Sequence, residues 1–128
     1  MLGDGTVRLQ ARGVDARIEV GEGTSFSNNV QVIAEESVTI GEHCLIGDAV
    51  LILDSDFHNL SAAGRHTLPG LSAPIILEDN VFIGSRVIIL KGVTIGKDSV
   101  IGAGSVVVRS IPPGVIAAGN PAKVIRPL

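Results

Sequence analysis

Large aliphatic side chains recur every six residues through the C-terminal half of this 128-residue chain. Six of them keep this spacing without a break: Leu77, Ile83, Ile89, Ile95, Ile101 and Val107. The apolar face of a helix repeats about every 3.6 residues and that of a strand every second residue, so neither gives a strict period of six. The period predicts a β-solenoid in which each hexad supplies one short strand and one tight turn, and three hexads close a roughly triangular coil.

Two other positions of the hexad support this interpretation. Glycine follows the aliphatic residue at several corners: Gly41, Gly47, Gly84, Gly96 and Gly102. A positive φ or a close approach of two backbones would each require glycine there, and the sequence leaves both explanations open. Four positions after the aliphatic residue the side chain is small or β-branched, as a narrow interior requires: Cys44, Val81, Val87, Val93, Ser99 and Ser105. The alternative is a β-sandwich with accidental spacing.

Composition limits the core and the partners. Hydrophobic residues make up 45% of the chain but aromatic residues only 2%, so the core consists of Val, Ile, Leu and Ala. A net charge of −3 indicates neither nucleic acid nor an anionic membrane as a partner. The single cysteine, Cys44, excludes an internal disulfide and is expected in the core. The sequence shows no leader peptide and no membrane-spanning apolar run, so we expect a cytoplasmic protein.

The register divides one domain, residues 1–128, into three parts. We expect a cap at residues 1–18, a β-helix at residues 20–107 and a short tail at residues 108–128. Within the β-helix the period slips by two residues, and the slip can be placed anywhere between Phe26 and Ile40.

The hexad pattern stops after Ile52 and resumes at Leu77. Continuing the count would place Asp56 and His58 at inward positions, where neither belongs unpaired among aliphatic side chains. The chain must therefore leave the coil near His58, and residues 59–73 are expected to form a projecting loop. Such loops commonly carry function on a repetitive scaffold.

Five stretches of the later sequence are specific enough to compare with known families: Pro74-Ile75, Asp79-Asn80-Val81-Phe82-Ile83-Gly84, Gly92-Val93-Thr94-Ile95-Gly96, Ile101-Gly102-Ala103-Gly104-Ser105-Val106-Val107 and Gly119-Asn120-Pro121-Ala122-Lys123-Val124-Ile125. Together they resemble the hexapeptide-repeat acyltransferases, in particular the branch of maltose, galactoside and colanic acid type O-acetyltransferases. The resemblance implies an all-β fold, a single-stranded left-handed parallel β-helix. Leu77-Glu78 departs from the usual Ile-Gly, and Phe82 stands where Trp is common. Many of these enzymes have a helical N-terminal segment, and residues 1–18 show no such pattern, so the resemblance leaves the acceptor open.

The resemblance implies that the catalytic base is His58, at the point where the chain exits into the loop. The chemistry agrees, because transfer of an acetyl group to a hydroxyl needs a base that titrates near neutral pH. Asp54 or Asp56 is close enough in sequence to orient the imidazole. The alternative for either is a cap on the loop backbone. In the loop, Arg65 and His66 are candidates for contacts with the acceptor, or are simply solvated.

The resemblance also implies acetyl-coenzyme A as the acyl donor, with no metal, bound between adjacent subunits of a homotrimer. A backbone N–H of Gly84 or Ser85 would support the thioester oxygen as it becomes an oxyanion. Main-chain groups of Ala103 and Gly104 would bind the pantetheine arm. The tail cations Lys123 and Arg126 would meet the nucleotide phosphates. Ordinary surface charge is the alternative for the two cations. A carbohydrate hydroxyl is the expected acceptor.

Two other functions remain open from the sequence. A γ-type carbonic anhydrase on the same fold holds its metal with three histidines, and this chain has three: His43, His58 and His66. The nearest two are eight residues apart, which does not match the spacing of that family. A non-catalytic solenoid scaffold would need neither the interrupting loop nor a histidine at its base. Binding of coenzyme A would separate an acetyltransferase from a scaffold.

Overall fold

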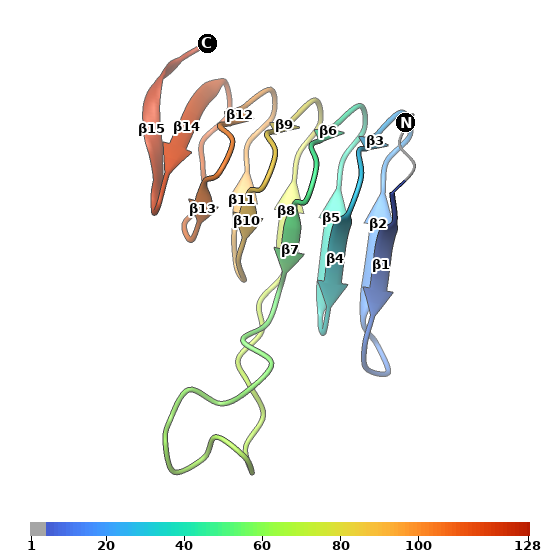
Figure 1. Cartoon of the computed structure of the whole chain (residues 1–128), viewed down its shortest axis with the longest axis vertical. Helices are drawn as coiled ribbons and strands as arrows, with labels where there is room; N and C mark the ends of the chain where they lie inside the picture. The colour runs from blue at the N-terminus through green and yellow to red at the C-terminus, as the bar shows by residue number, and fades with distance from the viewer. Residues whose placement is uncertain (1–4) are drawn as a thin grey trace.

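The computed structural model describes residues 5–128 and contains fifteen strands. Parallel strands stack in three sheets, and the coils follow one another along the solenoid from the N-terminus to the C-terminus (Figure 1). This confirms the left-handed parallel β-helix expected from the sequence. The described residues contain no helix, and so none that could cross a membrane.

The three sheets form the three sides of the coil. Sheet A contains β1 (Val7–Ala11), β4 (Val30–Ala34), β7 (Leu51–Leu53), β10 (Ile88–Ile89) and β13 (Val106–Val107). Sheet B contains β2 (Arg17–Val20), β5 (Ser37–Ile40), β8 (Ile75–Leu77) and β11 (Thr94–Ile95). Sheet C contains β3 (Ser25–Phe26), β6 (Leu45–Ile46), β9 (Phe82–Ile83), β12 (Val100–Ile101), β14 (Val115–Gly119) and β15 (Ala122–Pro127). All neighbouring strands are parallel except β14 and β15.

The predicted inward residues form the core. On each sheet one column of aliphatic side chains stacks in register and is buried: Val32, Ile52, Ile89 and Val107; Ile40, Leu77 and Ile95; Ile46, Ile83 and Ile101. Between these columns lie the small residues of the second inward position, including Cys44. Burial raises the pKa of the Cys44 thiol, because an apolar surrounding disfavours the thiolate. The core assignment of Cys44 is therefore confirmed.

None of the five corner glycines has a positive φ, and all but Gly102 serve close backbone approach. A Cβ on Gly84 would lie 2.7 Å from the backbone nitrogen of Ala103, and one on Gly47 would lie 2.8 Å from that of Ser85. The left-handed residue of each corner comes two positions later, for example Arg86 with φ 58°. Of the two explanations left open for these glycines, the structure supports the second.

All the variation in coil length falls at one corner, between sheets A and B. The step from an inward residue of sheet B to that of sheet C, and from sheet C to sheet A, is six residues in each coil from β4 onward. From sheet A to sheet B it is eight residues between Val32 and Ile40, and 25 between Ile52 and Leu77. The two-residue slip thus lies at the corner between β4 and β5.

Both ends of the solenoid extend beyond the expected boundaries. Strands β1 and β2 pair in parallel with β4 and β5, so residues 7–18 belong to the first coil and are not a separate cap. Eleven residues separate the register positions Leu9 and Val20 at the wide corner, which hides the hexad in the sequence. At the other end, β14 pairs in parallel with β12 and continues sheet C, while β15 folds back on it. The tail therefore completes a coil.

Replacing Ile95 by Ala should lower the free energy of unfolding by about 2–5 kcal/mol, because the side chain is fully buried and the narrow interior cannot collapse around the cavity. Chemical denaturation measures this. Ile76→Ala is the matched control: Ile76 faces outward from sheet B and is 40% exposed, so its loss should cost less than about 1 kcal/mol. Equal losses would contradict the inward column.

Candidate functional site

The long insertion between β7 and β8 projects away from the solenoid, as expected (Figure 1). Its two ends are joined at the base, where Ser55 and Ser72 form an antiparallel bridge. The N–H of Asp56 donates to the carbonyl oxygen of Leu71 over 2.9 Å. The loop therefore leaves the coil through a short, hydrogen-bonded base.

The base fixes the backbone of His58 and leaves its ring exposed. Gly70 packs so closely that a Cβ there would lie 2.7 Å from the backbone nitrogen of His58. The preceding residue, Phe57, is left-handed with φ 63°, and the guanidinium of Arg12 lies 5.3 Å from the centre of its ring. The imidazole of His58 is exposed and has no hydrogen-bond partner within residues 5–128. It is thus available to a substrate from a fixed position.

Asp54 is fully buried, and its carboxylate binds backbone rather than histidine. Oδ1 accepts the N–H of Glu35 over 2.7 Å, and Oδ2 accepts the N–H of Glu36 over 2.8 Å. These two amides belong to the wider corner of the preceding coil. Asp54 could orient the imidazole or cap the backbone, and its contacts are those of a backbone cap. They tie the loop exit to the coil beside it.

Asp56 makes a different contact. Its Oδ1 lies 2.8 Å from Nζ of Lys91, which stands at the corner between sheets A and B one coil further on. Its Oδ2 is buried and has no partner in the described part of the chain. Sequence reasoning missed Lys91, although the hexad register already places it two residues after inward Ile89, at the same corner as the loop.

A second group of predicted residues meets at the corner between sheets C and A. A surface pocket of about 400 Å³ there is lined by Asp48, Ser85, Arg86, Ala103 and Gly104. The structure thus brings together three of the residues predicted to bind the donor. Asp48 and Arg86 were not predicted. Asp48 occupies the corner position that Ser85 occupies in the next coil, and Arg86 directly follows Ser85.

The backbone of this pocket distinguishes between the two candidate oxyanion donors. The N–H of Gly84 donates to the carbonyl oxygen of Ile101 over 2.8 Å, within the ladder of the solenoid. The N–H of Ser85 has no backbone partner among residues 5–128. Nearby, hydrogen bonds from Ser27 Oγ and the N–H of Asn28 lower the pKa of Asp48. Asp48 therefore keeps its negative charge beside the free amide.

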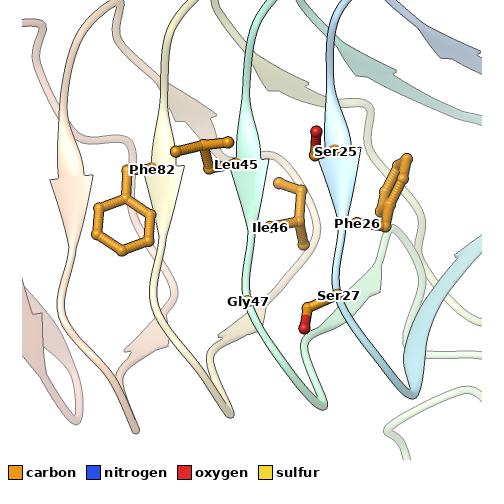
Figure 2. Close-up of a pocket in the computed structure, with 7 residues that line it drawn as sticks. All are labelled: Ser25, Phe26, Ser27, Leu45, Ile46, Gly47 and Phe82. Carbon is orange, nitrogen blue, oxygen red and sulfur yellow. The ribbon is translucent and has the colours of Figure 1, made fainter. Parts of the chain in front are cut away.

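An apolar surface lies next to this pocket on the outer face of sheet C. Phe82 and Leu45 point outward from neighbouring strands, with Ser25 beyond them in the same row (Figure 2). Phe82 is 46% exposed and Leu45 52% exposed, and they border a shallow hollow of about 220 Å³. Phe82 precedes Ser85 by three residues, so the strand that carries this apolar surface leads into the corner with the free amide.

The remaining predicted residues lie apart from both groups. Arg65 and His66 are exposed in the projecting loop, where the guanidinium of Arg65 donates to the carbonyl oxygen of Leu60. Lys123 and Arg126 are exposed on β15, at the end of sheet C. None of these four side chains forms an ion pair within residues 5–128.

The histidine and the donor pocket stand at opposite ends of sheet A. The loop of His58 follows the sheet A strand β7, whereas the corner that holds Ser85 precedes the sheet A strand β10. From Arg86 to Lys91 the chain runs five residues in nearly extended form, a span on the order of 15 Å. One chain therefore does not join the two groups into a single site.

The chain is similar to known acetyltransferases in sequence and in structure. Residues 74–109 match the family described as hexapeptide repeat of succinyl-transferase. The galactoside O-acetyltransferase of Escherichia coli is 42% identical over 111 residues, which cover 87% of this chain and 54% of that protein. This chain thus spans about half the length of the curated relatives it matches.

Solved structures show the same likeness. The hexapeptide-repeat acetyltransferase of Vibrio cholerae in complex with acetyl-coenzyme A has a TM-score of 0.83 and 36% identity, covering 99% of this chain and 70% of that one. A galactoside acetyltransferase in complex with coenzyme A also has a TM-score of 0.83 and 36% identity, covering 94% of this chain and 64% of that one.

The two contacts of Asp54 give a prediction that separates a cap from a catalytic group. Asp54→Asn should lower the free energy of unfolding by about 1–3 kcal/mol, because an amide accepts only one of the two N–H groups and both hydrogen bonds to a charged carboxylate are lost. Thermal denaturation measures the loss. An unchanged midpoint together with lost activity would instead assign Asp54 to the chemistry.

Proposed function

This chain belongs to the hexapeptide-repeat acetyltransferases, and we propose that it transfers the acetyl group of acetyl-coenzyme A to a hydroxyl of a carbohydrate. The relatives named as galactoside O-acetyltransferases and the neighbours solved with coenzyme A or acetyl-coenzyme A support this activity. The observation that carries the proposal is the free, exposed ring of His58 on a backbone held by the loop base. A donor made inside the cell agrees with the cytoplasmic location expected from the sequence.

The proposed reaction uses His58 as general base. Its unprotonated ring nitrogen takes the proton of the acceptor hydroxyl while the hydroxyl oxygen attacks the thioester carbonyl carbon. The carbonyl oxygen gains negative charge, and the free N–H of Ser85 stabilises it. When the tetrahedral intermediate collapses, the carbon–sulfur bond breaks and the imidazolium returns its proton to the departing thiolate of coenzyme A. The products are the acetyl ester and free coenzyme A.

The donor would lie along the corner between sheets C and A. Main-chain groups of Ala103 and Gly104 line the pocket there and suit the amides of the pantetheine arm. The apolar wall of Phe82 and Leu45 offers a surface for the methyl group and thioester. Lys123 and Arg126 are exposed on β15 at the end of the same sheet, and they are proposed to meet the nucleotide phosphates.

The acceptor would enter from the side of the loop. Arg65 and His66 are exposed there and are proposed to contact its hydroxyl groups. The likeness to galactoside O-acetyltransferases favours a sugar or a polysaccharide precursor as the acceptor.

We infer a homotrimer, because one chain places the base and the donor pocket at opposite ends of sheet A. The outer face of this sheet carries a row of half-buried aliphatic side chains, Leu51, Ile88 and Val106, in register on successive strands. If these rows face a threefold axis, the His58 corner of one copy meets the Ser85 corner of the next. The complete site would then lie between two subunits.

No observation favours the two other functions. Among residues 5–128 no three His, Cys, Asp or Glu side chains gather in an arrangement that could hold a metal ion. His43 lies on the corner between β5 and β6, apart from the loop that contains His58 and His66. A scaffold, for its part, would have no use for a free imidazole on a fixed backbone.

His58→Ala should lower kcat by about 10²–10⁴ while leaving the melting temperature and the affinity for coenzyme A unchanged, because a general base acts on the acceptor's proton and not on donor binding. Thiol release from acetyl-coenzyme A with a panel of sugars measures kcat, and calorimetry measures binding. His66→Ala is the control and should change only the KM of the acceptor. Full activity of the His58→Ala protein would refute the mechanism.

Subunit mixing tests the shared site. A His58→Ala copy lacks the base, and an Ala103→Trp copy has its donor pocket filled, so each homotrimer should be inactive. Random mixed trimers should recover up to about a quarter of wild-type activity, since an intact base then meets an intact pocket across some interfaces. Mixing without recovery, in trimers shown to have exchanged subunits, would place the site within one chain.

A further inference from the structure

The ion pair between Lys91 and Asp56 differs from the other ion pair of residues 5–128. Arg17 and Glu19 lie 3.9 Å apart on the surface, with side chains 74% and 63% exposed. Lys91 Nζ and Asp56 Oδ1 are 2.8 Å apart, with side chains 34% and 18% exposed. Taking two charges out of water costs free energy that their attraction only partly returns, so burial of this pair is weak support for a purely stabilising role.

The second oxygen of Asp56 has a more specific feature. Oδ2 is buried and has no hydrogen-bond partner in the described residues. A buried carboxylate oxygen without a donor loses its hydration and gains nothing in return, and such groups call for an explanation. Lys91 cannot remove this cost while it binds Oδ1. The carboxylate is therefore held on one side and still able to accept a hydrogen bond on the other.

The position of this carboxylate limits which donor can reach it. Asp56 lies two residues before His58, and left-handed Phe57 turns the chain between them. The N–H of Asp56 is bonded to Leu71, and Gly70 packs on the backbone of His58, so both main-chain positions are fixed. The side chain of His58 is exposed and makes no hydrogen bond within residues 5–128, so it is free to rotate about this fixed backbone.

We propose that Lys91 is a positioning residue of the active site, which acts through Asp56 on His58. Lys91 binds Oδ1 and holds the carboxylate in its orientation, and Oδ2 accepts the ring N–H of His58 that faces away from the acceptor. This hydrogen bond fixes the tautomer in which the opposite nitrogen is unprotonated and able to take the hydroxyl proton. The inference rests on the proposed function, since it assigns Lys91 a part in that same site.

Kinetics of three variants test this role. Lys91→Met should lower kcat about 10-fold, a fraction of the effect of removing the base, with the KM for acetyl-coenzyme A unchanged. Lys91→Arg should restore most of the lost activity, because arginine also donates to a carboxylate. Lys97→Met is the matched control: Lys97 lies at another corner of the same coil, is exposed and forms no ion pair within residues 5–128, so kcat should not change.

Nitrogen-15 spectra of the imidazoles test the contact directly and need no acceptor. In the complex with coenzyme A, wild type and Lys91→Arg should show one His58 ring N–H protected from exchange with water. Asp56→Asn and Lys91→Met should lose this signal while His43 is unchanged. Its absence from the wild-type complex, or its persistence in folded Lys91→Met or Asp56→Asn protein, would overturn the inference. If His58→Ala is inactive but Lys91→Met turns over like wild type, the inference fails and the proposed function stands.

Discussion

The architecture depends on how closely successive coils approach one another at two of their three corners. At Gly47, between sheets C and A, and at Gly96, between sheets B and C, there is no room for a Cβ, because the backbone of the next coil lies less than 3 Å from where it would be. Such contact fixes the path of the chain and thereby the six-residue step at these corners. Additional residues can enter only at the corner between sheets A and B, where the wide turns and the projecting loop all occur. The loop with His58 therefore lies at the corner between sheets A and B, because the other two corners leave no room for inserted residues.

This explains how much of the fold could be predicted from the sequence. Where the third corner is also short, as from Ile89 to Ile95, the hexad is unbroken and the inward residues follow directly. In the first coil the wide corner separates Leu9 from Val20 by eleven residues, so the six-residue period that starts at Val20 cannot be extended back to β1. Pairing with β4, and not any local pattern, identifies β1.

The contacts of the candidate site could likewise be predicted at the short corners and not at the loop. Ser85 and Gly104 could be predicted to meet because both follow the register of an unbroken corner. The contacts of the two aspartates could not. Asp54 binds amides 18 and 19 residues earlier in the chain, and Asp56 binds Lys91, 35 residues later, across an insertion whose length sets no register. Adjacent carboxylates in one short segment thus have unlike environments that composition and spacing do not reveal.

The difference between these carboxylates shows how stability and chemistry are divided at the loop base. Both oxygens of Asp54 are satisfied by amides, so it stabilises the corner and has nothing left to offer a histidine. Asp56 is satisfied at one oxygen only, and its second oxygen is a local cost that a more stable arrangement would remove. Proteins tolerate such costs where activity requires an unsatisfied group. On the proposed function, Asp54 supports the exit of the loop, and Asp56 keeps the free acceptor that a catalytic imidazole needs.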